Sequence, residues 1–235
     1  LGSETALKLR FPDNPVHRVM VQFNVVEMNP GHLHRGSEGA VTIESLPSDE
    51  TAKDLAEGIN CGLLPVHDCD DMKSLLWAKL QLNLGNGVNA LADIPVKAML
   101  EQRDFRRCFA LLMKELLAVC DAHGIELPKL TALPPKMLPR FLPLPDFLFT
   151  LLGNKMLAID PTVRTSMWWD LNQGKKTEVH YLNGAVVAAG EAKGLACPAN
   201  KALVEMIEAA EQGSLTPGLS AAEMWRRLGA SPQVL

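Results

Sequence analysis

The pattern of apolar residues changes once along this chain, near residue 70, and that change limits the folds open to it. Residues 19–26 and 39–44 are short runs rich in apolar and β-branched side chains, and an Asn-Pro-Gly turn follows the first of them. Such runs predict buried strands. Beyond residue 70, apolar residues recur only at helical spacing. The sequence therefore predicts an α/β segment over residues 1–70, followed by an all-α domain over residues 71–235.

The same patterns give the expected positions of the individual elements. In the first segment we expect a helix over 4–9, strands over 19–26 and 39–44, a helix over 50–60 capped by Asp49, and an edge strand over 63–67. In the second we expect helices over 71–92, 103–123, 135–152, 159–173, 177–193, 198–212 and 220–228. Six prolines lie between residues 127 and 145, and they are expected to break or kink the helix there.

The composition excludes several classes of protein. Hydrophobic residues make up 47% of the 235 residues and charged residues 21%, which is enough to bury a core and excludes a disordered chain. The formal net charge of -4 does not favour binding to nucleic acid, which depends on Lys and Arg neutralising phosphates. No apolar stretch reaches the about 20 residues that a membrane helix needs, and no secretion leader is recognisable. We therefore expect a cytoplasmic protein without a nucleic-acid or membrane partner.

Cysteines and histidines form no pattern that predicts a metal site. The five cysteines are scattered without a Cys-x-x-Cys pair, which is typical of reduced thiols rather than of a disulfide framework or a zinc site. His32 and His34 flank Leu33, but no carboxylate at suitable spacing completes a ligand set. We expect surface histidines and no bound metal.

Residues 85–90 match the Gly-x-Gly-x-x-Ala fingerprint of dinucleotide binding. The fingerprint binds a pyrophosphate only at a turn from a strand into a helix, with a second strand further along the chain. Here Pro95 cuts short any helix that follows, and residues 105–112 are helical in pattern. We therefore interpret this run as part of a helical region and not as a nucleotide-binding turn.

The same stretch, taken as a helix, presents one narrow polar stripe. Lys79, Asn83, Asn86 and Asn89 follow one another at helical spacing among apolar residues. An ammonium and three amides that face inward are costly unless polar groups meet them. Three interpretations stay open: a ligand site, a solvated stripe, or amides that pair with loop carbonyls.

A second polar segment begins at Ser166, where a helical pattern starts that Gly174 is expected to end. Glu178 follows in the first turn of the next predicted helix. The helix dipole favours a carboxylate at that position, so Glu178 is also explained without any ligand. No nucleophile elbow or P-loop occurs in the sequence, which disfavours the commonest hydrolase and NTPase chemistries.

Together these residues resemble the ketopantoate reductases, or 2-dehydropantoate 2-reductases. The likeness rests on Trp-Ala-Lys-Leu-x-x-Asn over residues 77–83, Asn-Ala-Leu over 89–91, Ser-Met over 166–167, Thr-Glu-x-x-Tyr-Leu-Asn-Gly over 177–184, and Gly194 through Pro198 and Asn200. Upstream, Phe-Asn-Val-Val over residues 23–26 and the Pro-Gly turn with His34 and Gly39 look like the last strands of the family's Rossmann domain. The resemblance covers almost the whole chain, and it is the combination of motifs that is specific.

The resemblance implies a fold and an activity. Family members reduce a 2-oxo acid with NADPH, using an N-terminal Rossmann domain and a helical domain of the 6-phosphogluconate dehydrogenase C-terminal type. Residues 1–70 would then be an α/β remnant, the C-terminal part of the NADP-binding Rossmann domain. Residues 71–235 would be the helical substrate-binding, catalytic and dimerisation domain of a homodimer. The implied reaction is the reduction of 2-dehydropantoate to pantoate in pantothenate biosynthesis.

The resemblance also implies roles for five residues. Lys79 matches the family's general acid, whose ammonium stabilises and protonates the alkoxide left by hydride transfer. Glu178 matches the carboxylate that holds the substrate hydroxyl and contacts the cofactor, and it could also keep Lys79 charged. Ser166 matches a hydroxyl that contacts the substrate carboxylate, and Asn83 and Asn89 match amides that line the cleft.

Two features depart from the family pattern. His180 stands where many members carry Asp, which leaves the identity of the 2-oxo acid open. The glycine-rich turn that holds the nucleotide is expected before residue 1, so the chain by itself is expected to bind NADPH poorly and to be inactive. The alternatives are a reductase of another 2-oxo acid and a non-catalytic helical dimerisation module.

Overall fold

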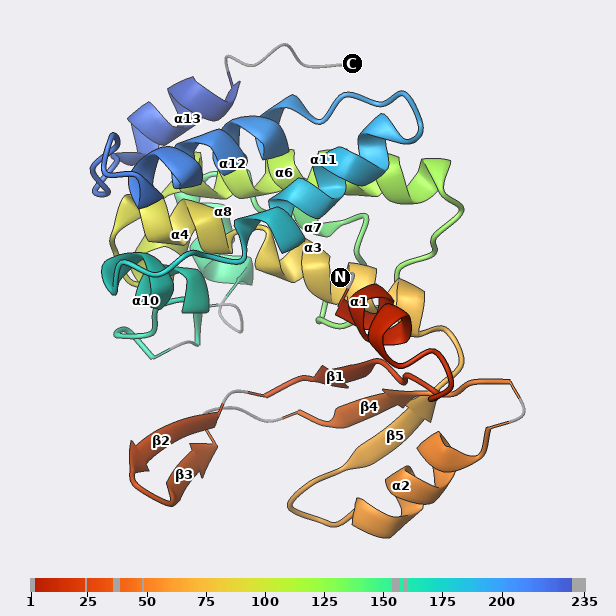
Figure 1. Cartoon of the computed structure of the whole chain (residues 1–235). Helices are drawn as coiled ribbons and strands as arrows, with labels where there is room; N and C mark the ends of the chain where they lie inside the picture. The colour runs from red at the N-terminus through yellow and green to blue at the C-terminus, as the bar shows by residue number, and fades with distance from the viewer. Residues whose placement is uncertain are drawn as a thin grey trace. The chain divides into compact units, whose positions relative to one another are not determined.

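The computed structural model describes residues 3–23, 25–35, 39–47, 49–153, 157–158 and 160–229. Its contacts divide the chain into two compact units, Leu1–Leu76 and Trp77–Leu235. Figure 1 shows the strands gathered in the first unit and most of the helices in the second.

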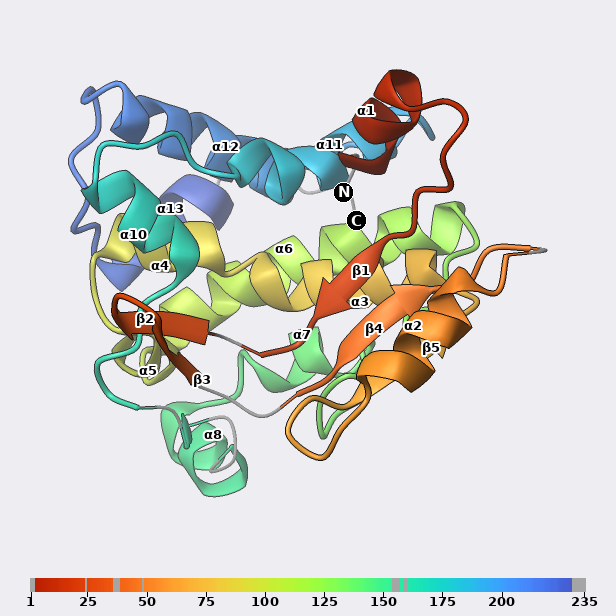
Figure 2. The same ribbon diagram turned by 60° about the horizontal axis from the view of Figure 1, so that its bottom comes forward.

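A three-stranded sheet with one helix against it forms the centre of the first unit. The strands β1 (Val19–Val21), β4 (Val41–Glu44) and β5 (Val66–Cys69) lie in the order β1-β4-β5. β1 is antiparallel to β4, whereas β4 and β5 are parallel. Parallel strands need a crossover connection, and here α2 (Thr51–Ile59) provides it and packs on both strands (Figure 2). The helix α1 (Ser3–Arg10) precedes the sheet. The apolar core of α2 and the sheet consists of Ile43, Ala52, Ala56 and Val66.

The predicted continuous strand over residues 19–26 is wrong, because the structure divides it between two sheets. β1 ends at Val21, and β2 (Val25–Asn29) pairs with β3 (His32–Arg35) in a separate antiparallel hairpin. Gly31 makes the turn at a φ of 79°, a conformation that glycine adopts without strain. The sequence analysis missed β3, since His-Leu-His-Arg has neither the composition nor the apolar alternation of a buried strand.

The other elements of the first unit lie near their predicted positions. β5 starts just after Pro65 and lies at the edge of its sheet, as the proline predicts. The Pro65 carbonyl accepts a hydrogen bond from the Val41 backbone N–H at 2.9 Å. Asp49 accepts a hydrogen bond from the Thr51 backbone N–H at 2.9 Å, which satisfies a donor at the start of α2.

Helices build the second unit, and the described residues after β5 include no strand, as predicted. In chain order the helices are α3 (Met72–Asn83), α4 (Asn86–Ala92), α5 (Val96–Leu100), α6 (Arg103–Ala122), α7 (Leu138–Phe141), α8 (Asp146–Leu152), α10 (Ser166–Asn172), the 3-10 turn η1 (Val179–Tyr181), α11 (Asn183–Glu191), α12 (Pro198–Glu211) and α13 (Ala221–Gly229). The short α5, which begins after Pro95, was not predicted.

The helix α6 lies at the centre of this unit and ends within one residue of its predicted position. It packs against α11, α12 and α13, beside which it runs in Figure 1. Cys108, Leu112, Leu116 and Val119 recur at helical spacing along its inner face and are fully buried. This face therefore anchors the apolar core of the second unit.

Several predicted helices are shorter or divided. The predicted helix over 71–92 breaks between α3 and α4 at Gly85, against which the ring of Phe109 packs so closely that an added Cβ would lie 3.2 Å from it. The helix predicted over 135–152 is divided into α7 and α8, with Pro143 and Pro145 between them. The helices predicted over 159–173 and 177–193 begin later, at α10 and at η1 with α11.

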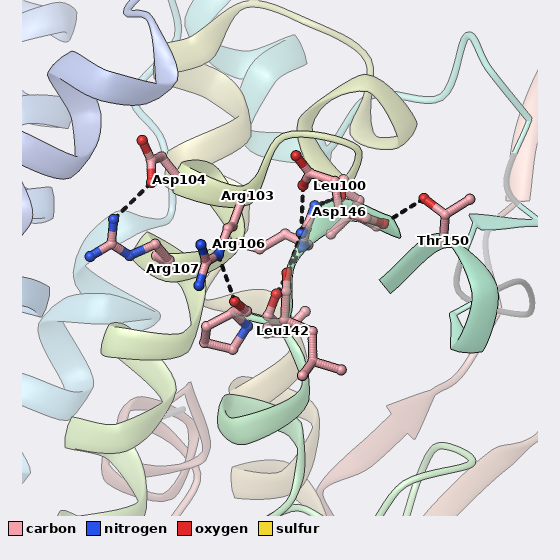
Figure 3. Close-up of polar contacts among 10 residues, drawn as sticks. Leu100, Arg103, Asp104, Arg106, Arg107, Leu142, Asp146 and Thr150 are labelled. Carbon is pink, nitrogen blue, oxygen red and sulfur yellow. Dashed lines mark hydrogen bonds and ion pairs between the residues drawn. The ribbon is translucent and has the colours of Figure 1, made fainter. Parts of the chain in front are cut away.

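A buried arginine fixes the proline-rich segment to α6. Arg106, which is 1% exposed, donates from Nε to the Leu142 carbonyl and from Nη1 to the Leu100 carbonyl, both at 2.8 Å. Its Nη2 donates to the Leu144 carbonyl and to Asp146 Oδ1, again at 2.8 Å. Figure 3 shows the guanidinium among these partners. The planar fork of arginine thus satisfies two carbonyls between α7 and α8, those of Leu142 and Leu144, and the carbonyl of Leu100 at the end of α5.

Glycine is required at one position of α11. A Cβ on Gly190 would lie 2.7 Å from Cys197 Sγ and 2.8 Å from the Leu195 carbonyl oxygen. Because the carbonyl belongs to the backbone, we expect Gly190→Ala to lower the free energy of unfolding by about 1–3 kcal/mol. Gly184→Ala in the same helix is the control, since its Cβ would meet His180 at an ordinary 3.6 Å. Urea unfolding of both variants measures this, and equal stability of the two would contradict the packing described.

Candidate functional site

Lys79 lies on α3 with its side chain half-buried. Burial lowers the pKa of its ammonium below the usual 10.5, and the charge of Glu178 opposes this by raising the pKa. The charge of Glu178 therefore acts on the Lys79 ammonium although the two residues are far apart in the sequence.

Glu178 is held at the start of η1 by its neighbours. Thr177 donates its backbone N–H to Glu211 Oε1 at 2.8 Å, which ties the segment to the end of α12. On the other side, Val179 is fully buried in the core. The exposed Glu178 carboxylate accepts a hydrogen bond from Ser166 Oγ at 3.1 Å. The ammonium, the hydroxyl and the carboxylate therefore come from α3, α10 and the segment before η1.

Asn83 follows Lys79 by one helical turn and so lies on the same face of α3. It is half-buried at the C-terminal end of that helix. The expected polar stripe does not continue beyond it, because the break at Gly85 separates α3 from α4. Asn86 and Asn89 thus belong to a second helix.

Asn89 is fully buried on α4. It is 0% exposed, and its Nδ2 donates to the Ile94 carbonyl at 2.8 Å. Its Oδ1 accepts from the Thr165 backbone N–H at 3.2 Å and from the Thr165 hydroxyl at 3.1 Å. These bonds match the alternative in which amides pair with loop groups, and they hold the residue that precedes α10. The role of Asn89 as a cleft-lining amide stays a prediction.

His180, which departs from the family pattern, pairs with a glutamate on α12. Its Nε2 lies 3.1 Å from Glu208 Oε1 on α12, and both side chains are exposed. In the dinucleotide-like run over residues 85–90, Gly85 precedes α4 and the other residues lie within it, so the run follows the helix α3 and not a strand, as predicted.

Three further features are absent from the described part of the chain. No group of three or more His, Cys, Asp or Glu side chains among the described residues could hold a metal ion. No disulfide joins the five cysteines, all of which lie in the described ranges. None of the described helices is long and apolar enough to cross a membrane.

Comparison with known proteins assigns the chain to a family. Residues 71–211 match the sequence profile described as ketopantoate reductase PanE/ApbA C terminal. The chain belongs to the ketopantoate reductase family. The matched residues include most of the helical unit, and the expected resemblance is confirmed.

Individual ketopantoate reductases cover different shares of the chain. The 2-dehydropantoate 2-reductase of Pyrobaculum aerophilum is 30% identical over 159 residues, which are 67% of this chain and 50% of that protein. The corresponding enzyme of Pyrococcus abyssi is 27% identical over 77% of this chain and 56% of its own length. The chain therefore spans about half the length of the curated relatives it matches.

Solved structures show the same fold. The ketopantoate reductase of Ralstonia eutropha aligns with a TM-score of 0.66 and 26% identity, over 85% of this chain and 60% of that one. A D-mandelate dehydrogenase, solved with NADH and anilino(oxo)acetate, aligns with a TM-score of 0.72 and 20% identity, over 91% of this chain and 65% of that one. At that identity the second likeness shows the fold alone.

Sequence reasoning missed a group of side chains beside Ser166. Asp93, Arg164 and Trp168 contact one another where α4 meets α10. The only sequence features that could have indicated this group were the positions of Arg164 and Trp168, each two residues from Ser166. Nothing in the sequence placed Asp93 near them.

The effect of Glu178 on Lys79 gives a prediction about pH. Glu178→Gln removes the charge that raises the pKa of Lys79 and leaves the larger lowering by burial, so Lys79 is expected to lose its proton at lower pH than in the unmodified protein. Competitive acylation of Lys79 as a function of pH, measured by peptide mass spectrometry, reports this pKa. Glu208→Gln, which removes the partner of His180, is the control and is expected to leave it unchanged. An unchanged Lys79 pKa in Glu178→Gln would show that Glu178 does not act on Lys79.

Proposed function

We propose that this chain carries the substrate-binding and proton-donating groups of a nicotinamide-dependent reductase of 2-oxo acids, with 2-dehydropantoate as substrate and pantoate as product. The observation that carries the proposal is the convergence of Lys79, Ser166 and Glu178 from three separate segments. The names of the relatives support the reaction, since they are called 2-dehydropantoate 2-reductases.

The chemistry of the three groups fits that reaction. A 2-oxo acid has a carboxylate next to a ketone, and reduction of the ketone leaves negative charge on its oxygen. The Lys79 ammonium stabilises this charge and then donates a proton from Nζ to the oxygen. Its lowered pKa makes it a stronger acid, while Glu178 opposes loss of the proton before substrate binds.

Ser166 and Glu178 orient the substrate in this proposal. The Ser166 hydroxyl donates to the substrate carboxylate, which requires it to exchange its present bond to Glu178. The freed Glu178 carboxylate then accepts from the substrate hydroxyl. Asn83, on the same face of α3 as Lys79, contributes an amide to this surface.

The cofactor of the proposal is NADPH, which supplies the hydride when bound. An exposed carboxylate such as that of Glu178 has acceptor sites beyond its bond to Ser166, so it fits contact with a cofactor hydroxyl as well. In the described ranges no strand leads through a glycine-rich turn into a helix. We therefore assign the pyrophosphate to no residue of this chain.

The fold of the first unit agrees with this assignment. The parallel β4-α2-β5 crossover is the kind of unit from which Rossmann sheets are built. We infer that residues 1–70 are the C-terminal part of such a domain, and residues 71–235 a domain of the 6-phosphogluconate dehydrogenase C-terminal type. A cytoplasmic homodimer completes the proposal, and one similar structure is described as a dimeric ketopantoate reductase from Staphylococcus aureus.

The test is a substrate panel with the full natural protein. Oxidation of NADPH and of NADH is followed with 2-dehydropantoate, with smaller 2-oxo acids and with an aromatic 2-oxo acid. We expect turnover with 2-dehydropantoate and a preference for NADPH. Turnover of a different 2-oxo acid would correct the substrate, and the absence of turnover with every member would favour a non-catalytic helical module.

A further inference from the structure

Asp93, at the C-terminal end of α4, holds the residues on both sides of Ser166. Its Oδ1 accepts a hydrogen bond from Trp168 Nε1 at 2.6 Å and another from Arg164 Nη1 at 3.2 Å. The Arg164 guanidinium also lies over the Trp168 ring, 4.2 Å from its centroid. One carboxylate therefore joins a residue before Ser166 to a residue after it.

The backbone of Asp93 is in an uncommon conformation. Its φ of 53° and ψ of 35° make it the one non-glycine residue with positive φ in the described part of the chain. Such a conformation costs energy for any residue with a Cβ, although Asp and Asn tolerate it best. Glycine is the usual residue there, so the presence of Asp points to a use for its side chain.

The same end of α4 fixes the backbone next to Ser166. Asn89 Oδ1 accepts from the backbone N–H and from the hydroxyl of Thr165. The Thr165 hydroxyl oxygen in turn caps α10, because it accepts from the Trp168 backbone N–H at 3.3 Å. Ser166 itself is exposed and makes its bond to Glu178 from this fixed turn. The direction of its hydroxyl is therefore set by residues that do not touch it.

We propose that Asp93 is a positioning residue that acts through Ser166 on the carboxylate of the substrate. This rests on the proposed function. Loss of the Asp93 carboxylate frees Arg164 and Trp168, so the first turn of α10 is no longer held from both sides. The hydroxyl of Ser166 then loses its orientation, and binding of the substrate carboxylate weakens.

The kinetic test is a double-mutant cycle in the full natural protein. Asp93→Ala is expected to raise the KM for the 2-oxo acid about tenfold, the size expected for one lost charge-assisted hydrogen bond, with little change in kcat or in the KM for NADPH. In a Ser166→Ala background, Asp93→Ala is expected to have no further effect. An equal further rise in that background would overturn the proposal, because Asp93 would then act independently of Ser166.

Two variants control for the structural cost of the change. Asp93→Asn tolerates the same backbone conformation and keeps an oxygen that accepts from Trp168, so it is expected to restore most of the affinity. Asp121→Ala removes an exposed carboxylate that pairs with Lys136 elsewhere in the same unit, and it is expected to change nothing. An Asp93→Asn variant as weak as Asp93→Ala would contradict the role assigned to the Trp168 bond.

A spectroscopic test separates this proposal from the proposed function. In nitrogen–proton NMR spectra, Trp168→Phe identifies the indole signal of Trp168 among those of the four tryptophans. In Asp93→Ala, that indole signal and the backbone amide signal of Ser166 are both expected to move. A Ser166 signal that stays in place overturns the positioning role, whether or not the protein reduces a 2-oxo acid.

Discussion

Lys79→Met is expected to lower kcat of the full natural protein by about 10²–10⁴-fold, the usual contribution of a general acid. The variant keeps a side chain of similar length, so it removes the proton donor while filling the same half-buried space on α3. Because burial lowers the pKa of Lys79, removing its charge is not expected to destabilise the fold. NADPH oxidation and urea unfolding measure the two properties on the same sample.

Lys201→Met, which changes an exposed lysine on α12, is the control for a lost positive charge. It is expected to keep the kcat of the unmodified protein. A Lys79→Met variant that turned over as fast as this control would remove Lys79 from the proposed mechanism.

Arg106→Leu is expected to lower the free energy of unfolding by about 3–5 kcal/mol, as when one partner of a buried charged network is removed. Leucine leaves the carbonyls of Leu100, Leu142 and Leu144 without their donor in the protein interior. It also removes the guanidinium that lies 4.1 Å from the ring centroid of Phe149. Urea unfolding followed by circular dichroism gives the free energy and its slope.

Arg103→Leu is a matched control on the same helix. Arg103 donates to the Pro143 carbonyl at 2.8 Å, but this bond is exposed, and Figure 3 shows it beside the Arg106 network. Its loss is expected to cost no more than about 1 kcal/mol, because water replaces the donor. Equal destabilisation by the two substitutions would show that the buried network does not hold the proline-rich segment.

The helical half of the fold was largely predictable from the sequence. The helix α6 has an apolar face at strict helical spacing, so its limits follow from the pattern. The break at Gly85 and the short α5 did not follow, because they depend on the ring of Phe109 and on the turn after Pro95. In the first unit, the strand β3 is mostly polar and exposed, and local apolar patterns carry no signal for such a strand.

The candidate site, like the fold, was predictable from the sequence only in part. Lys79, Ser166 and Glu178 could be singled out because a family motif surrounds each. In the structure Ser166 donates to Glu178, whose charge raises the pKa of Lys79, and the roles of the three residues stay predictions. The hydrogen bonds of Asn89 could not be predicted, because its partner Thr165 belongs to a distant segment of the chain. Asp93 carries no motif at all, since its role depends on the three-dimensional meeting of α4 and α10.

A crystal structure of the full natural protein with pantoate measures most directly whether these groups form one site. We expect Lys79 Nζ within about 3.2 Å of the hydroxyl oxygen that derives from the ketone, which is the reach of a proton donor. We also expect the pantoate carboxylate at Ser166 and the other hydroxyl at Glu178. Pantoate bound away from Lys79, or bound with its carboxylate remote from Ser166, would contradict this arrangement.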